Sequence, residues 1–184
     1  RFRMNKITST VIGDLIQNEQ FTGWWHSKPT LIPLLDLELP ITFMDYDPLI
    51  DTEFIPEADA ALKNFLAFTS IEKLKLAPHI FENFVEISSY LNVDDIPEKI
   101  RGAQPLSIWN FVHPTQLFIN RRPTNDKDLY VVLACECEWE KEHGLQMVFR
   151  QGKKLTRVSD QDGHLTEADA YDLPDDKDEL LSKF

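Results

Sequence analysis

The chain has 184 residues, of which 42% are hydrophobic and 27% are charged. This composition is typical of a globular protein, and it excludes long disordered, collagen-like and coiled-coil structures. The 31 acidic residues outnumber the 19 basic ones, which gives a formal net charge of −12. Sequence-independent binding of DNA or RNA needs cations that displace phosphate counterions, so this charge argues against nucleic acid and favours a basic protein as the partner.

Apolar runs and cysteine content predict a cytoplasmic protein without membrane contact. No apolar run approaches the roughly 18 residues of a spanning helix, and residues 4–19 lack the apolar core of a signal peptide. Two cysteines are too few for a secreted disulfide framework, so we expect reduced thiols. Residues 1–3 precede Met4 and are interpreted as a cloning scar.

The first third of the chain is predicted to form short strands. Aromatic and β-branched residues are concentrated in residues 21–26, 30–37 and 40–44, with glycine and proline between them. Proline inside such a segment restricts it to an edge or a bulge. We therefore expect a small antiparallel meander.

The central part of the chain has helical periodicity. Residues 58–68 place an apolar stripe on one helical face. Thr69 and Glu72 have the spacing of a capping box, which introduces a second helix with apolar residues over 80–91. Pro78 predicts a kink in this helix or a start at that position. A short third helix is expected after it, and all three are interpreted as core packing.

The C-terminal half returns to strand patterns, and these complete the predicted fold. Residues 129–139 alternate strictly, and further strands are expected at 116–121, 145–149 and 155–158. The resulting prediction is an α+β domain over residues 4–158. An antiparallel sheet, built from N-terminal and C-terminal strands, packs against the central helical block.

The last part of the chain, residues 159–184, is predicted to lie outside this domain. It contains nine acidic residues and two lysines. Because it has little to bury, we expect an acidic tail or a surface extension.

Candidate partner-binding residues lie in a stretch without basic residues. Between Lys28 and Lys63 there are eight acidic residues. One interpretation is a solvated loop. The other is an electrostatic face for a cationic partner, whose field raises the association rate more than the affinity. This second interpretation assigns partner binding to Asp45, Asp47, Asp51 and Glu53.

The Trp24-Trp25 pair adds an aromatic candidate. In a half-buried strand the two rings face opposite ways, so that one stays near the surface. An exposed tryptophan among acidic residues suits an interface hot spot, and we assign this role to Trp25. Burial of both rings is the alternative.

The familiar catalytic and metal motifs are missing. The chain contains no nucleophile elbow, phosphate loop or zinc helix. Cys135, Cys137 and His143 would supply soft metal ligands, but they lack the usual spacing and a fourth ligand, and the cysteines lie on the apolar face of a strand. The residues around Gly163 do not fit a calcium-loop register and are interpreted as a β-turn. We therefore expect no metal and no cofactor.

Glu140, Glu142 and His143 form the densest polar cluster. As an acid–base site, they would pair a carboxylate with an imidazole, although no nucleophile lies nearby in the sequence. The alternative is a turn whose side chains cap backbone groups beside an acidic rim. The three residues are included among the candidate partner contacts.

The stretch from Cys137 to Gln146, followed by Phe149 to Gly152, resembles a bacterial family of small uncharacterised domains with a W-E-x-E-H-G motif. Residues 21–25 and 55–91 are similar to other parts of that family. The resemblance implies an α+β domain often encoded near secreted or contact-delivered toxins, where members look like immunity proteins. It assigns no catalytic role, and the stretch beyond residue 163 does not map onto the family. The residues that match the motif are Trp139, Glu140, Glu142, His143 and Gly144.

Three functional hypotheses follow. The leading one is a cytoplasmic immunity protein that blocks the active site of a cognate, basic bacterial toxin, because the chain is acidic and lacks catalytic motifs. A regulatory or scaffolding interaction domain is the second hypothesis. The third is a hydrolase that uses Glu140, Glu142 or His143, which requires a pocket around His143.

Overall fold

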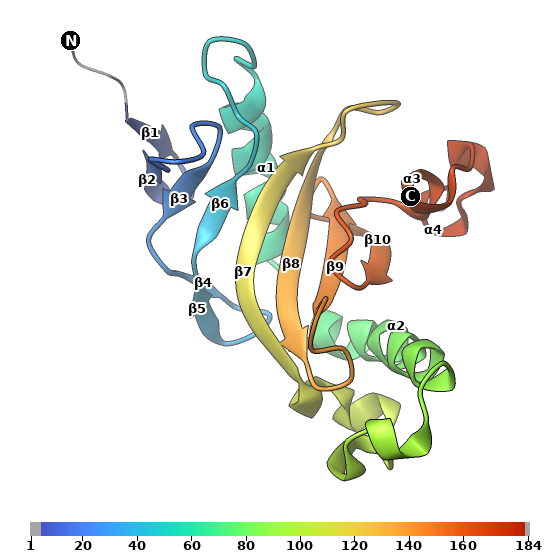
Figure 1. The fold of residues 1–184 in the computed structure, drawn as a ribbon. Coiled ribbons are helices and arrows are strands. Elements are labelled where there is room, and N and C mark those ends of the chain that lie inside the picture. Colours follow the sequence, from blue (N-terminus) through green and yellow to red (C-terminus); the bar gives the residue numbers. More distant parts are fainter. Residues whose placement is uncertain (1–4, 183–184) are drawn as a thin grey trace.

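The computed structural model describes residues 5–182, so the interpretation of residues 1–3 as a cloning scar lies outside the described residues. The described residues form a mixed eight-stranded sheet with helices behind it (Figure 1). The predicted α+β class is confirmed. The strand order is β1-β2-β3-β6-β7-β8-β9-β10, and a separate two-stranded sheet contains β4 and β5.

The N-terminal strands are shorter and more numerous than predicted. The hairpin of β1 (Lys6–Ser9) and β2 (Gly13–Gln17) was not expected, because its residues are largely polar; Gly13 supplies the left-handed turn conformation with a φ of 81°. The predicted segments contain β4 (Thr30–Ile32) and β6 (Ile41–Phe43), and they overlap only in part with β3 (Trp25–Ser27) and β5 (Leu37–Leu39).

The sheet is mixed rather than antiparallel, because β6 pairs in parallel with β7 (Val112–Arg121). Between these two strands the chain passes through the helical block. A connection that long allows the chain to return in the same direction, which a tight hairpin cannot do. The expectation of a purely antiparallel sheet is therefore wrong at the pair that joins the N-terminal and C-terminal strands.

Two long helices cover one face of the sheet, α1 (Phe54–Leu66) and α2 (Ser70–Ser89) (Figure 1). The predicted capping box is confirmed, because the Thr69 side chain accepts a backbone N–H and the Glu72 carboxylate accepts the Thr69 N–H at 2.6 Å. The helix therefore starts at Ser70 and runs through Pro78. In place of the third helix there are 3₁₀ turns: η1 (Val93–Asp95), η2 (Glu98–Ile100) and η3 (Pro105–Phe111).

The main core lies between these helices and the sheet. The apolar face predicted for β8 (Leu129–Cys137) faces this core, together with β9 (Leu145–Arg150) and β10 (Lys154–Ser159). Cys135 and Cys137 are buried free thiols, and burial raises the pKa of Cys137 to about 11. No helix within residues 5–182 has the length and apolarity needed to span a membrane.

The segment after β10 is an ordered surface extension rather than a solvated tail. It contains α3 (Glu167–Tyr171), η4 (Asp175–Lys177) and α4 (Glu179–Ser182), which lie beyond β10 in Figure 1. Leu165 joins a second apolar cluster with Tyr130, Val132 and Val148 of β8 and β9, separate from the main core. The extension thus buries apolar side chains that the sequence pattern did not reveal.

Candidate interaction site

The acidic loop, defined as residues 45–53, connects β6 to α1 and projects beyond the end of the sheet (Figure 1). At its tip, the Leu49 side chain is 90% exposed and the Ile50 side chain 82% exposed. Two adjacent aliphatic side chains with this much exposed surface make the tip a candidate binding site, because burial against a partner would remove their apolar surface from water.

Tyr46 anchors the first part of this loop to the core. Its ring is buried and stacks on Phe54 with a centroid distance of 4.4 Å. Its backbone N–H donates to the Gly23 carbonyl at 2.9 Å, and its carbonyl accepts the Trp25 indole N–H at 3.0 Å. Gly23 allows a close approach here, because a Cβ at this position would lie 3.2 Å from the Asp45 Cα and would require the loop backbone to shift slightly.

Arg121, near the end of β7, anchors the second part of the loop. Its Nε donates to the Asp51 carboxylate at 2.6 Å, and its Nη1 donates to Glu57 of α1 at 2.7 Å. Burial alone would lower the pKa of Arg121, but these carboxylates reverse the effect and raise it. The loop tip is therefore held between two fixed points before any partner arrives.

The acidic residues of this region differ in what they contact. Among residues 5–182, Asp45, Asp47 and Glu53 form no ion pair. The Asp47 carboxylate accepts the Leu49 backbone N–H at 2.9 Å and so stabilises the turn. Asp51 is neutralised by Arg121. Asp59 is buried in α1 and accepts hydrogen bonds from Ser9 and Thr10. Asp45, Asp47 and Glu53 are exposed and flank the apolar tip along the chain.

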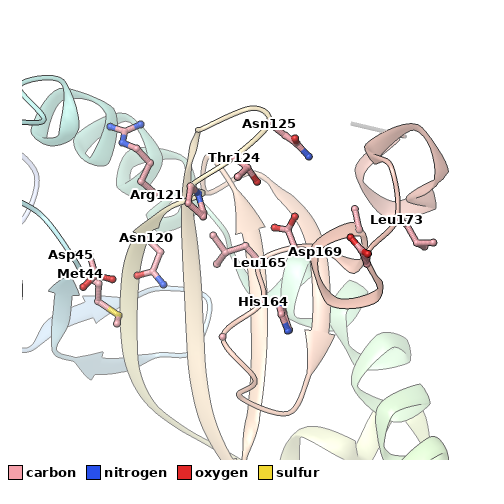
Figure 2. A pocket seen from close by; sticks show the side chains of 14 residues that line it. Met44, Asp45, Asn120, Arg121, Thr124, Asn125, His164, Leu165, Asp169 and Leu173 are labelled. Atoms are coloured by element: carbon pink, nitrogen blue, oxygen red, sulfur yellow. The ribbon is translucent and has the colours of Figure 1, made fainter.

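A pocket of about 850 Å³ opens beside the acidic loop, and Asp45 belongs to both. Figure 2 shows Met44, Asp45 and Asn120 on one side of it, with His164, Leu165 and Asp169 from the C-terminal extension on the other. Asp169 is neutralised by Arg122, whereas Asp45 has no ion-pair partner among the described residues. The pocket therefore offers apolar contacts and unneutralised negative charge close to the loop.

Trp25, assigned as an exposed hot spot, is in fact buried. It is only 1% exposed, because its ring packs against Tyr46 and its indole N–H donates to the Tyr46 carbonyl. It therefore supports the loop and does not reach a partner. Trp24 is half-buried on the opposite side, where its ring is 6.5 Å from that of Phe118.

Glu140, Glu142 and His143 lie far from the acidic loop. They occupy the turn after β8, and the end of β8 pairs with the start of β7. The acidic loop follows β6, whose last residue pairs near the other end of β7. Ten residues of strand separate the two places, roughly 30 Å. The sequence-predicted contacts thus fall on two ends of the sheet, and only Asp45, Asp47, Asp51 and Glu53 share one region.

The Glu140 turn has a structural explanation. The Glu140 carboxylate accepts the backbone N–H groups of Glu142 and His143 at 3.1 and 3.2 Å, while the His143 side chain is 60% exposed.

Gly144 has a φ of 63°, and a Cβ there would lie 2.6 Å from the Cys135 carbonyl oxygen. The Trp139 indole donates to Asn83 of α2 at 3.0 Å. These contacts correspond to the turn alternative, and no cluster that could hold a metal ion occurs within residues 5–182.

Sequence reasoning missed Leu49 and Ile50. The signal was partial: Asp47-Pro48-Leu49-Ile50-Asp51 places two aliphatic residues between acidic ones without strand or helix periodicity. This pattern does not by itself predict exposure, because Leu34 and Leu35, which also lie outside regular structure and next to an acidic residue, are buried.

Fold and site together define a small α+β domain with a rigid, apolar-tipped acidic loop. The chain belongs to the family described as a domain of unknown function, DUF6985, which matches residues 11–165. Comparisons with curated proteins and with solved structures give no match.

Proposed function

We propose that this protein is an interaction protein that binds a basic protein partner through the acidic loop. The exposed Leu49 and Ile50 at the tip carry the proposal. They would fill an apolar depression on the partner, while Asp45, Asp47 and Glu53 meet its cationic rim. The pocket beside Asp45 would accept a lysine or arginine side chain from that rim.

The fixed anchors at Tyr46 and Arg121 support this proposal energetically. Association is opposed by the entropy of ordering loops and side chains at an interface. A loop already held by a buried ring and a double ion pair loses less freedom on binding. The net charge of −12 adds long-range attraction to a basic partner and raises the association rate.

A bacterial toxin is the partner we propose within this class. Toxins that cleave nucleic acids carry basic active sites, because their substrates are polyanions. An acidic loop with an apolar tip could occupy such a site as a mimic of the substrate charge. In this role the protein would act as an immunity protein in the cytoplasm of the producing cell.

The test is a comparison of three baits in lysate of the source cells. The loop variant carries Asp45→Asn, Asp47→Asn and Glu53→Gln, and leaves Asp51 on Arg121 untouched. The control variant removes the same charge elsewhere, from three exposed residues: Glu19→Gln, Asp94→Asn and Glu98→Gln. The partner, once identified, is then measured in binding kinetics at low and high salt.

The proposal predicts that wild type and control capture the same basic protein and that the loop variant loses it. It also predicts that the loop variant associates at least about tenfold more slowly at low salt, because the three substitutions each remove one negative charge. Equal capture by the loop variant would contradict the proposal. A partner that is not basic, or whose association does not depend on salt, would contradict the charge-mimic part alone.

A further inference from the structure

Helix α2 carries a second apolar surface that faces away from the core. Its buried residues, including Leu76 and Ile80, face the sheet side. On the other side of the helix, Ile71 and Leu74 are each 60% exposed and Val85 is 50% exposed. A helix that packs one face on a core normally presents polar residues on the other, so this exposed stripe calls for an explanation.

The stripe has the spacing of a helix–helix seam. Its positions 71, 74, 78, 81 and 85 are separated alternately by three and four residues, which is the a/d pattern of a heptad. Pro78 is exposed, and Phe81 packs partly against the main core while the rest of its surface stays open to solvent, so the row has no gap. It extends over about 21 Å of helix.

Charged residues beside the stripe indicate what covers it. Lys75 and Glu82 are seven residues apart and therefore hold the same heptad position on the same flank. The other flanking position is held by Ala77 and Phe84, which are buried against the core. Among residues 5–182, neither Lys75 nor Glu82 forms an ion pair.

We propose that α2 pairs with α2 of a second copy of this chain in antiparallel orientation. In an antiparallel pair, residues at this flanking position face each other, so Lys75 of each copy lies opposite Glu82 of the other. A two-fold axis near Pro78 forms both ion pairs at once. A parallel pair would instead place these charges against Ala77 and Phe84 and form neither.

The dimer is independent of the proposed partner binding. The acidic loop and α2 lie toward opposite ends of the molecule in Figure 1, so pairing through α2 leaves both loops exposed. One helix pair lies at the lower end of protein interface sizes, below about 1,200 Å². The dimer is therefore weak and depends on concentration, and salt strengthens it because the two copies repel each other through their net charge of −12.

Sedimentation velocity of the full chain tests the pairing at concentrations from about 1 μM to about 1 mM. The wild type is expected to shift from monomer to dimer over this range. Leu74→Glu should weaken the dimer at least about tenfold, because it places two carboxylates in the seam. Leu106→Glu introduces the same charge at an exposed position on η3 and should leave the dimer unchanged.

Charge reversal tests the orientation. Lys75→Glu and Glu82→Lys should each weaken the dimer about two- to tenfold, and the double reversal should restore it. Circular dichroism confirms that each variant is folded. A wild type that is monomeric throughout, or a dimer indifferent to Leu74→Glu, would overturn the proposal. Failure of the double reversal to restore a dimer that both single reversals weaken would overturn the antiparallel arrangement.

Discussion

The acidic loop and the C-terminal extension are both rich in acidic residues, but they differ in where the charge goes. In the extension, Asp169 and Asp175 bind the fully buried Arg122, and Asp162 and Glu167 bind Arg157. Within residues 5–182, Asp51 is the only one of the loop carboxylates Asp45, Asp47, Asp51 and Glu53 that has a cationic partner. The same residue type is thus a structural ligand in one region and a solvent-facing charge in the other.

Arg122 explains why the extension is ordered. Its guanidinium is inaccessible to solvent and donates to Asp126, Asp169 and Asp175 at 2.7 to 3.0 Å. Burial alone would lower the pKa of Arg122, but the three carboxylates more than reverse this and raise it. A buried charge that is fully paired attaches the extension to the sheet, whereas acidic residues without a cation have no such effect.

The largest effect is expected for Arg122→Met. Removal of the cation leaves three carboxylates close together, so the free energy of unfolding should fall by about 3–5 kcal/mol. Hydrogen exchange should become fast in α3 and α4. Arg101→Met, at an exposed position, serves as the control in denaturant titrations. A loss below about 1 kcal/mol would mean that the ion pairs do not hold the extension.

Asp59→Ala should give the next largest loss of stability. Asp59 belongs to the same base-free stretch as the acidic loop, yet it accepts the Thr10 N–H at 3.0 Å and the Thr10 hydroxyl at 2.7 Å. We expect a decrease of about 2–3 kcal/mol in the free energy of unfolding, since charged hydrogen bonds are broken in a buried place. Glu53→Ala, measured in parallel, should change it by less than about 0.5 kcal/mol. Equal decreases in the free energy of unfolding for the two variants would contradict the assignment of Asp59 as a structural acid and Glu53 as an exposed one.

The pH dependence of Asp175 gives a smaller effect. The hydrogen bond from Arg122 lowers the pKa of Asp175 below its ordinary value of 3.8. Its contribution to stability is therefore complete above pH 3.8 and is lost as the pH falls through the lower, folded-state pKa. The stability difference between wild type and Asp175→Asn should be largest near neutral pH and shrink in acid. A difference that grows in acid would contradict the assigned sign.

The smallest effect is expected at the loop tip. Leu49→Ser with Ile50→Ser should leave the free energy of unfolding within about 0.5 kcal/mol of wild type, because neither side chain is buried. Thermal unfolding of the double variant measures this directly. A clear loss of stability would show that the tip packs within the molecule, and it would remove the main reason to assign the tip to partner binding.

Local patterns predicted the elements that depend on local rules. The capping box at Thr69 is confirmed, because its hydrogen bonds join residues only three apart. The β8 strand is confirmed as well, and alternate residues along it pack into two different apolar clusters, although both of its faces are buried. The β1–β2 hairpin was missed because its polar residues lack such a pattern. The parallel pairing of β6 with β7 depends on the path of the chain between them, which periodicity does not reveal.

The site could be predicted only in part, for a related reason. The base-free stretch drew attention to the acidic loop, but the fate of each carboxylate depends on Arg121, which lies 70 residues after Asp51 in the chain. Likewise, Arg122 contacts Asp169 and Asp175 at separations of 47 and 53 residues. Trp25 was assigned to the surface because strand alternation does not indicate what covers each face.

Site-specific photo-crosslinking in the source cells tests whether the tip of the acidic loop contacts a basic protein partner. A photoreactive amino acid replaces Leu49 in one strain and Leu106, which is also exposed, in another. We expect the probe at position 49 to crosslink to one basic protein and the probe at position 106 not to do so. Capture of that protein through position 106, or its binding without any crosslink from position 49, would contradict the assignment of the acidic loop as the binding site.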